Sequence, residues 1–292
     1  MGEFNADLVD DLARQRVVLF LGAGVSASAS TRSGGRIKGW EAFLTEMVGK
    51  APIGVREQVS RLLQQKDFLL ACEILQTTLA DTWEREIVQE FGQAAEPSPL
   101  HEAIVALDQR IIVTTNFDKL LEMSWESKLG FSTHFPQVIT TIDANIFNML
   151  KDHSGKYLIK LHGTIDDVRS LVFSRSEYIR MAFGSAVYFT FLETLLLNYT
   201  FLFIGFSMDD PAISSLMELY TLRYPRARPH YIVSPEGTDQ NIIDINKRIR
   251  KLVAITYDNS ENHAKLPVLI GDLAGHLKPR RKEIAAKYLN ES

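Results

Sequence analysis

Short apolar runs recur along the chain, and the stretches between most of them show helical spacing. The first run, Val17–Leu21, is apolar at every position, which is typical of a strand buried on both faces of a parallel sheet. The later runs are Ile111–Val113, Tyr157–Ile159, Phe201–Ile204, Tyr231–Val233 and Leu252–Ile255. This alternation predicts an α/β fold, a Rossmann-like doubly wound parallel sheet.

The interval between the first two runs is far longer than one crossover helix requires. Helical patterns within it cover residues 40–48, 55–64, 68–79, 82–91 and 100–106. We therefore expect a helical insertion at about 40–108, after the first βα unit. A length of 292 residues suits a single domain over 1–292 that contains this insertion and a C-terminal helical tail at about 265–292.

Composition limits the classes of protein to which the chain can belong. Apolar residues make up 46% and charged residues 23%, as in soluble globular proteins. The net charge of −4 gives no overall positive field, so direct nucleic-acid binding is not expected. The basic cluster Lys278–Lys282 fits either a solvated helix start or a docking site for a partner.

Cysteine content and hydropathy predict a cytoplasmic protein. Cys72 is the sole cysteine, which excludes an intramolecular disulfide and any cysteine-built zinc site, so no metal is expected. Acidic residues precede the first apolar run, the wrong order for a secretory signal. The most apolar stretch, Leu195–Phe206, is too short to span a bilayer, and no membrane contact is expected.

A glycine-rich turn follows the first strand. Gly22, Ala23, Gly24 and Ser26 stand where a strand gives way to a helix, and glycines there let a pyrophosphate approach free backbone N–H groups. A turn of small residues without a ligand shows the same pattern. Glu41 has the spacing of a dehydrogenase ribose ligand but begins a helix, and no GxxxxGK phosphate loop for ATP is present.

Polar residues also follow three later strands, at the edge where parallel sheets present side chains to ligands. They are Thr115, Asn116 and Asp118 after the second run, His162 with Gly163 after the third, and Gly205 with Ser207 after the fourth. Asp118 is also placed to act only as a helix N-cap, and a histidine beside a glycine is often structural. Their joint occurrence favours one shared crevice.

These residue types suit cleavage of the nicotinamide–ribose bond of NAD. Nicotinamide leaves NAD as a neutral molecule, so its departure needs no general acid and no glycosidase-type carboxylate pair. An amide such as that of Asn116 can hold the ribose hydroxyls or a water. An imidazole such as that of His162 can accept a proton.

In combination the motifs resemble those of the sirtuin family, over about residues 12–235. The matching segments are Gly22–Ser26, Thr114–Asp118, His162–Gly163 and Gly205–Ser207. The resemblance implies that Gly22, Ala23, Gly24 and Ser26 hold the NAD phosphates, that Thr115, Asn116 and Asp118 line the ribose and nicotinamide site, and that His162 is the base. It also implies that Gly205 and Ser207 contact the nucleotide and that Ser234 touches the adenosine end.

The chain departs from protein-deacetylating sirtuins in two respects. It cannot build their four-cysteine zinc module, and Gly39–Leu44 replaces their Pro-Asp-Phe-Arg segment, so that Trp40 is in position to cover the site. It is closer to a prokaryotic sirtuin-like group with Thr-Thr-Asn-Phe-Asp, Lys-Leu-His-Gly, Ser-x-x-x-Tyr and Gly-Phe-Ser-x-Asp-Asp-Pro elements. Ser174–Tyr178 matches the third of these.

That resemblance implies a regulated NAD⁺ glycohydrolase, with NAD as substrate, that depletes NAD in antiphage defence. Because free NAD hydrolysis would harm the host, we also expect a repressed resting state. The resemblance also implies a homo-oligomer and a separate partner, such as a HerA-type ATPase. Two other functions stay open, namely a binding module that senses NAD or ADP-ribose for a partner, and a zinc-less NAD-dependent deacylase.

Overall fold

A seven-stranded sheet forms the centre of the molecule. The computed structural model describes residues 4–31, 35, 37–92, 95–129 and 135–290. Strand order is β5-β6-β4-β1-β7-β8-β9, and all neighbouring strands are parallel. The strands are β1 Val17–Leu21, β4 Ile111–Thr114, β5 Gln137–Ile139, β6 Tyr157–Lys160, β7 Thr200–Ile204, β8 His230–Pro235 and β9 Leu252–Tyr257. The predicted Rossmann-like α/β fold is confirmed.

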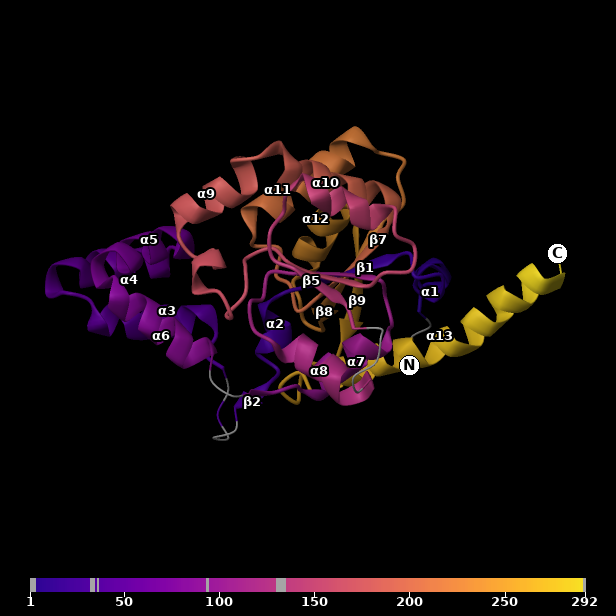
Figure 1. Ribbon diagram of the computed structural model, residues 1–292, viewed down its shortest axis with the longest axis horizontal. Coiled ribbons are helices and arrows are strands. Elements are labelled where there is room, and N and C mark those ends of the chain that lie inside the picture. The colour runs from indigo at the N-terminus through magenta and orange to yellow at the C-terminus, as the bar shows by residue number, and fades with distance from the viewer. Residues whose placement is uncertain (1–3, 32–34, 36, 93–94, 130–134, 291–292) are drawn as a thin grey trace.

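Helices cover both faces of this sheet (Figure 1). One side carries α9 Arg175–Phe183, α10 Ala186–Asn198, α11 Pro211–Arg223 and α12 Gln240–Arg250. The other carries α1 Ala6–Ala13, α7 Pro99–Ala106, α8 Leu120–Leu129 and α13 Lys265–Asn290, whose C-terminal part projects from the body. Short elements complete the chain: α2 Ala23–Ser26, the antiparallel pair β2 Ser30–Thr31 and β3 Ala95–Glu96, and the 3-10 helices η1 Ala144–Leu150 and η2 Val168–Ser170.

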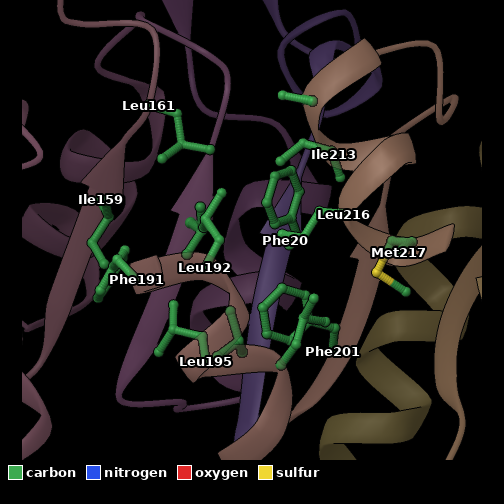
Figure 2. Close-up of a cluster of buried hydrophobic side chains, with 14 of the residues drawn as sticks. Phe20, Ile159, Leu161, Phe191, Leu192, Leu195, Phe201, Ile213, Leu216 and Met217 are labelled. Carbon is green, nitrogen blue, oxygen red and sulfur yellow. The ribbon is translucent and has the colours of Figure 1, made fainter. Parts of the chain in front are cut away.

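The alternation of side chains along β1 divides the core into two layers. Val18 and Phe20 pack towards α10 and α11, whereas Leu19 and Leu21 pack towards α1, α7 and α13. Figure 2 shows the first layer, in which Phe20 lies among side chains of β7, α10 and α11. Because both layers are apolar, β1 is buried along its whole length, as its sequence predicts.

The helices between β2 and β3 have a core of their own. These are α3 Trp40–Lys50, α4 Ile53–Gln64, α5 Phe68–Leu79 and α6 Asp81–Phe91, which lie together at one end of the molecule (Figure 1). Trp83, Phe43 and Cys72 are buried among them. The last helix of the expected insertion, α7, packs on α13 and α8, beside the sheet. The division at 40–108 stays our interpretation.

Polar contacts attach this helical unit to α9. Ser176 donates from its backbone N–H and its hydroxyl to the carboxylate of Glu73, at 2.9 and 3.1 Å. The Gln76 amide donates to Glu177 at 2.9 Å. The unit is therefore fixed to the helix that also carries Tyr178, a residue of the site described below.

The edge strand β5 was not predicted from the sequence. It has three residues, of which Gln137 and Val138 are exposed, so it lacks the buried apolar run that marks the other strands. Helix α1 was not predicted from the sequence either. Its N-cap is Asn5, whose side chain accepts from the N–H groups of Asp7 and Leu8.

The described residues contain neither a single membrane-spanning helix nor a cluster of metal ligands. Within them no single helix is long and apolar enough to cross a membrane, and α9 and α10 pass that test only together, bent by 64°. The same residues hold no group of three or more His, Cys, Asp or Glu side chains placed to bind a metal ion.

Replacing Trp83 with alanine tests the core of the helical unit. We expect the free energy of unfolding to fall by about 3–5 kcal/mol, because the change leaves a large cavity. Urea denaturation followed by circular dichroism measures it. Val88→Ala on the same helix is the control, because Val88 is 46% exposed. Equal, small losses in both variants would contradict the packing described here.

Candidate functional site

The ends of four strands form one row across the sheet. Leu21 pairs with Thr114 on one side and with Ile204 on the other, and Thr114 pairs with Lys160. The residues two positions beyond β1, β4 and β6 are therefore Ala23, Asn116 and His162, all at the same edge. The motifs picked out in the sequence converge because their strands end level with one another.

Three glycines let the loops after β1 and β7 touch through their backbones. A Cβ on Gly22 would lie 2.5 Å from the carbonyl oxygen of Gly205, and Gly24 N–H donates to that oxygen at 2.9 Å. Gly205 has φ +62°, which favours glycine. These glycines are thus required by loop packing, independently of any ligand.

Asn116 joins the loop after β4 to the loop after β1. Its Nδ2 donates to the carbonyl of Gly22 at 2.8 Å, and its backbone N–H donates to Oγ1 of Thr114 at 3.0 Å. The amide therefore has a structural partner that the sequence did not reveal. Since Nδ2 is engaged, Oδ1 is the atom that can accept a hydrogen bond from a ligand.

Asp118 is the cap that its position before a helix predicts. Its Oδ1 accepts from Leu120 N–H at 2.9 Å at the start of α8, and its Oδ2 accepts a short hydrogen bond from Ser26. The backbone carbonyl of Asp118 accepts from Nζ of Lys160 at 2.6 Å. This residue therefore holds three loops together while its side chain lines the cavity described below.

Lys160 forms a buried ion pair beneath the site. Its Nζ lies 2.5 Å from Oε1 of Glu122, with side chains 1% and 9% exposed. Burial raises the pKa of Glu122, and the charge of Lys160 opposes that rise. The pair ties the end of β6 to α8 under the loop that carries Asn116.

His162 faces a carboxylate of the β7–α11 loop. Its Nε2 lies 3.5 Å from Oδ2 of Asp210. Gly163, with φ +83°, turns the chain here, and a Cβ on it would meet the Ser170 carbonyl oxygen at 2.1 Å. The imidazole is thus held between a tight turn and an acidic partner.

Asp210 is in turn held by Tyr178 of α9. The Tyr178 hydroxyl donates to Oδ1 of Asp210 at 2.5 Å, and the N–H groups of Ala212 and Ile213 donate to the same oxygen, each at 3.0 Å. Burial raises the pKa of Asp210, but the His162 imidazole and these donors outweigh it and hold that pKa below its usual value. Burial and the Asp210 charge raise the pKa of Tyr178.

These side chains border a cavity of about 660 Å³ between the sheet edge and the helical unit. That volume is within the range of small-molecule sites. Ala23, Ser26, Thr115, Asn116, Asp118 and His162 line it, together with Tyr178 and Asp210. The other residues assigned from the resemblance, namely Gly22, Gly24, Gly205, Ser207 and Ser234, are not in its wall, and their roles stay predictions.

Aromatic side chains form part of the cavity wall. They include Trp40, Phe91, Phe117 and Phe173. Trp40 and Phe173 stack with ring centroids 4.9 Å apart. An aromatic face beside polar strand ends suits a ligand with one flat ring and one sugar.

Sequence reasoning left two site residues without a role. Asp210 and Tyr178 occur in the sequence only as letters of family motifs, and in the structure Asp210 is also the N-cap of α11. The signal that could have linked them is that both belong to motifs shared with the same prokaryotic group. Nothing in their spacing shows that they meet at His162.

Comparisons with known proteins identify the family. Residues 110–257, half of the chain, match the SIR2-like domain family. The chain belongs to the SIR2-like family. Solved structures similar to this one include a complex of a Sir2 homologue with NAD, at a TM-score of 0.45, 14% identity and 96% coverage of both chains.

Curated relatives include proteins named NAD(+) hydrolase ThsA and one named Defense-associated sirtuin 2. An NAD(+) hydrolase ThsA of Enterococcus faecium is 30% identical over 165 residues, which are 54% of this chain and 32% of that protein. The ThsA of Bacillus cereus (strain MSX-D12) is 23% identical over 91% of this chain and 53% of its own length. Defense-associated sirtuin 2 of Bacillus subtilis is 22% identical over 72% of this chain and 20% of its own length. The chain thus spans about half or less of the length of these relatives.

Replacing Lys160 with methionine tests the buried ion pair. We expect the free energy of unfolding to fall by about 3–5 kcal/mol, because Glu122 is left buried without its cation. Denaturant titration measures the loss. Adding Glu122→Leu should restore part of it, since an apolar pair removes the uncompensated charge.

The matched control is Lys119→Met. Lys119 pairs with Asp166 at 2.8 Å, but these side chains are 48% and 58% exposed, so the change should cost less than about 1 kcal/mol. A loss for Lys160→Met no greater than that of the control would show that the buried pair is unimportant for stability.

Proposed function

We propose that this SIR2-like chain hydrolyses NAD⁺ to nicotinamide and ADP-ribose. The observation that carries the proposal is that Asn116 and His162 line the same cavity, at the edge of the sheet where β1, β4 and β6 end in register. Membership of the SIR2-like family and the similarity to proteins named NAD(+) hydrolase support it. NAD is therefore the proposed substrate, with no metal and no second cofactor.

In the proposed complex the nicotinamide and its ribose occupy the cavity, and the rest of the dinucleotide extends across the neighbouring strand ends. The aromatic wall of Trp40 and Phe173 accepts the flat nicotinamide ring, and Oδ1 of Asn116 accepts from a ribose hydroxyl. Backbone N–H groups around Ala23 and Ser26 approach the phosphates. The adenosine then extends over the loops that contain Ser207 and Ser234.

The reaction needs one bond to break and one to form. The bond between the ribose C1′ and the nicotinamide nitrogen breaks, and its electron pair neutralises the positively charged ring. A water attacks the resulting oxocarbenium-like carbon and loses its proton to His162. The balance is NAD⁺ and water giving nicotinamide, ADP-ribose and one proton, which His162 passes to solvent.

The same relatives support a proposal about the biological setting. We propose a cytoplasmic effector that depletes NAD in antiphage defence, because Defense-associated sirtuin 2 and the ThsA proteins are similar to it. Uncontrolled hydrolysis would exhaust the host's own NAD, so we further propose a repressed resting state. The resemblance noted in the sequence supports a homo-oligomer and a partner such as a HerA-type ATPase.

Substituting the two central residues tests the proposed chemistry. Nicotinamide release from NAD by the purified protein, alone and with any co-purifying partner, is followed by chromatography. Asn116→Ala and His162→Ala should each lower the rate by about 100-fold or more, since one loses a ribose ligand and the other the base.

His153→Ala is the matched control, because His153 is exposed and lies outside the cavity. It should leave the rate unchanged. Full activity of the Asn116 and His162 variants would exclude the proposed mechanism. NAD binding without turnover would favour the sensing module, and NAD consumption only with an acylated peptide would favour the deacylase.

A further inference from the structure

The two nitrogens of His162 have different surroundings. Nε2 faces Asp210 at 3.5 Å, and this atom is buried, with no hydrogen bond in the described part of the chain. The ring as a whole lines the cavity. A water or a substrate hydroxyl in the cavity cannot reach the buried Nε2. Nδ1 is therefore the nitrogen that can take a proton from the cavity.

The two oxygens of Asp210 also have different partners. Oδ1 accepts from the Tyr178 hydroxyl and from the N–H groups of Ala212 and Ile213. Oδ2 faces His162. An ionised carboxylate only accepts hydrogen bonds, so its neighbour Nε2 is the nitrogen that must carry the hydrogen.

We propose that Asp210 is a positioning residue that holds His162 in the Nε2–H tautomer, with the Nδ1 lone pair directed at the cavity, and that Tyr178 acts by fixing Asp210. The inference rests on the proposed NAD hydrolysis, in which His162 is the base. The carboxylate also stabilises the positive charge that the imidazole gains on accepting the proton.

This role accounts for features that helix capping leaves unexplained. A cap needs only the hydrogen bonds from Ala212 and Ile213. It needs neither a tyrosine from another helix nor a histidine from another strand. Tyr178 also accepts from the Ala212 N–H at 2.8 Å, so its hydroxyl is held at both sides and fixes the carboxylate in one orientation.

The substitution Asp210→Asn distinguishes the role of Asp210 in orienting His162 from its role as the N-cap of α11. Asparagine is as good a helix N-cap as aspartate, so α11 is retained. Its amide nitrogen, placed where Oδ2 stood, donates a hydrogen bond instead of accepting one. It therefore favours the opposite tautomer, in which Nδ1 carries the hydrogen and cannot accept a proton.

The direct measurement is long-range ¹H–¹⁵N NMR of the ¹⁵N-labelled full chain, with the His162 signals identified by their loss in His162→Ala. The wild type should show a protonated Nε2 and an unprotonated Nδ1, and Asp210→Asn should reverse the two. Asp209→Asn is the control and should leave the pattern unchanged. A wild type with hydrogen on Nδ1, or an unchanged pattern in Asp210→Asn, would overturn the inference.

Kinetics provide the second measurement. We expect Asp210→Asn to lower kcat by about 10²–10⁴-fold. The Kd of ADP-ribose should change by less than about threefold, because the cavity wall is kept. An unchanged kcat would show that Asp210 is a cap only.

A pair of tyrosine variants isolates the hydroxyl of Tyr178. Tyr178→Phe should lower kcat about tenfold through loss of a charge-assisted hydrogen bond. Tyr220→Phe is the matched control, because Tyr220 is buried and lies outside the cavity wall, so kcat should be unchanged. Equal kcat in both variants would exclude the role of Tyr178. Because the NMR pattern needs no turnover, a wild type that does not hydrolyse NAD counts against the proposed function alone.

Discussion

The pairing of β1 with a parallel strand on each side is the constraint on which the site depends. Leu21 is level with Thr114 and with Ile204, and Thr114 is level with Lys160. Parallel strands present their carboxyl ends at one edge, so loops distant in sequence meet there. A shift of one residue in any of these registers would turn that strand's side chains to the opposite face. Burial of both faces of β1 makes such a shift costly.

Several side chains of the site are fixed by structural partners. Asn116 uses Nδ2 to hold Gly22, and Asp118 caps α8 and accepts from Ser26. Asp210 caps α11 while its second oxygen faces His162. Asn116 keeps Oδ1 for a ligand, and Asp210 keeps Oδ2 for His162. Such fixed orientation is what a preorganised site requires.

Much of the fold could be predicted from the sequence because its strands are continuous apolar runs ending in small or polar residues. The positions of Asn116 and His162 followed from those ends. The three-residue strand β5 could not be predicted, because Gln137 and Val138 at the edge of the sheet are exposed. The contact of Asp210 with Tyr178 and His162 could not be predicted either, since it depends on where the packing of α9 places Tyr178 relative to the loops after β6 and β7. A capping role already accounted for Asp210 locally.

The central claim is that Asn116 and His162 face the same ribose. A crystal structure of the full chain soaked with ADP-ribose, the proposed product, tests it most directly. We expect the terminal ribose to lie in the cavity, within hydrogen-bond distance of Oδ1 of Asn116 and of Nδ1 of His162. ADP-ribose bound with its terminal ribose in contact with neither side chain would contradict it.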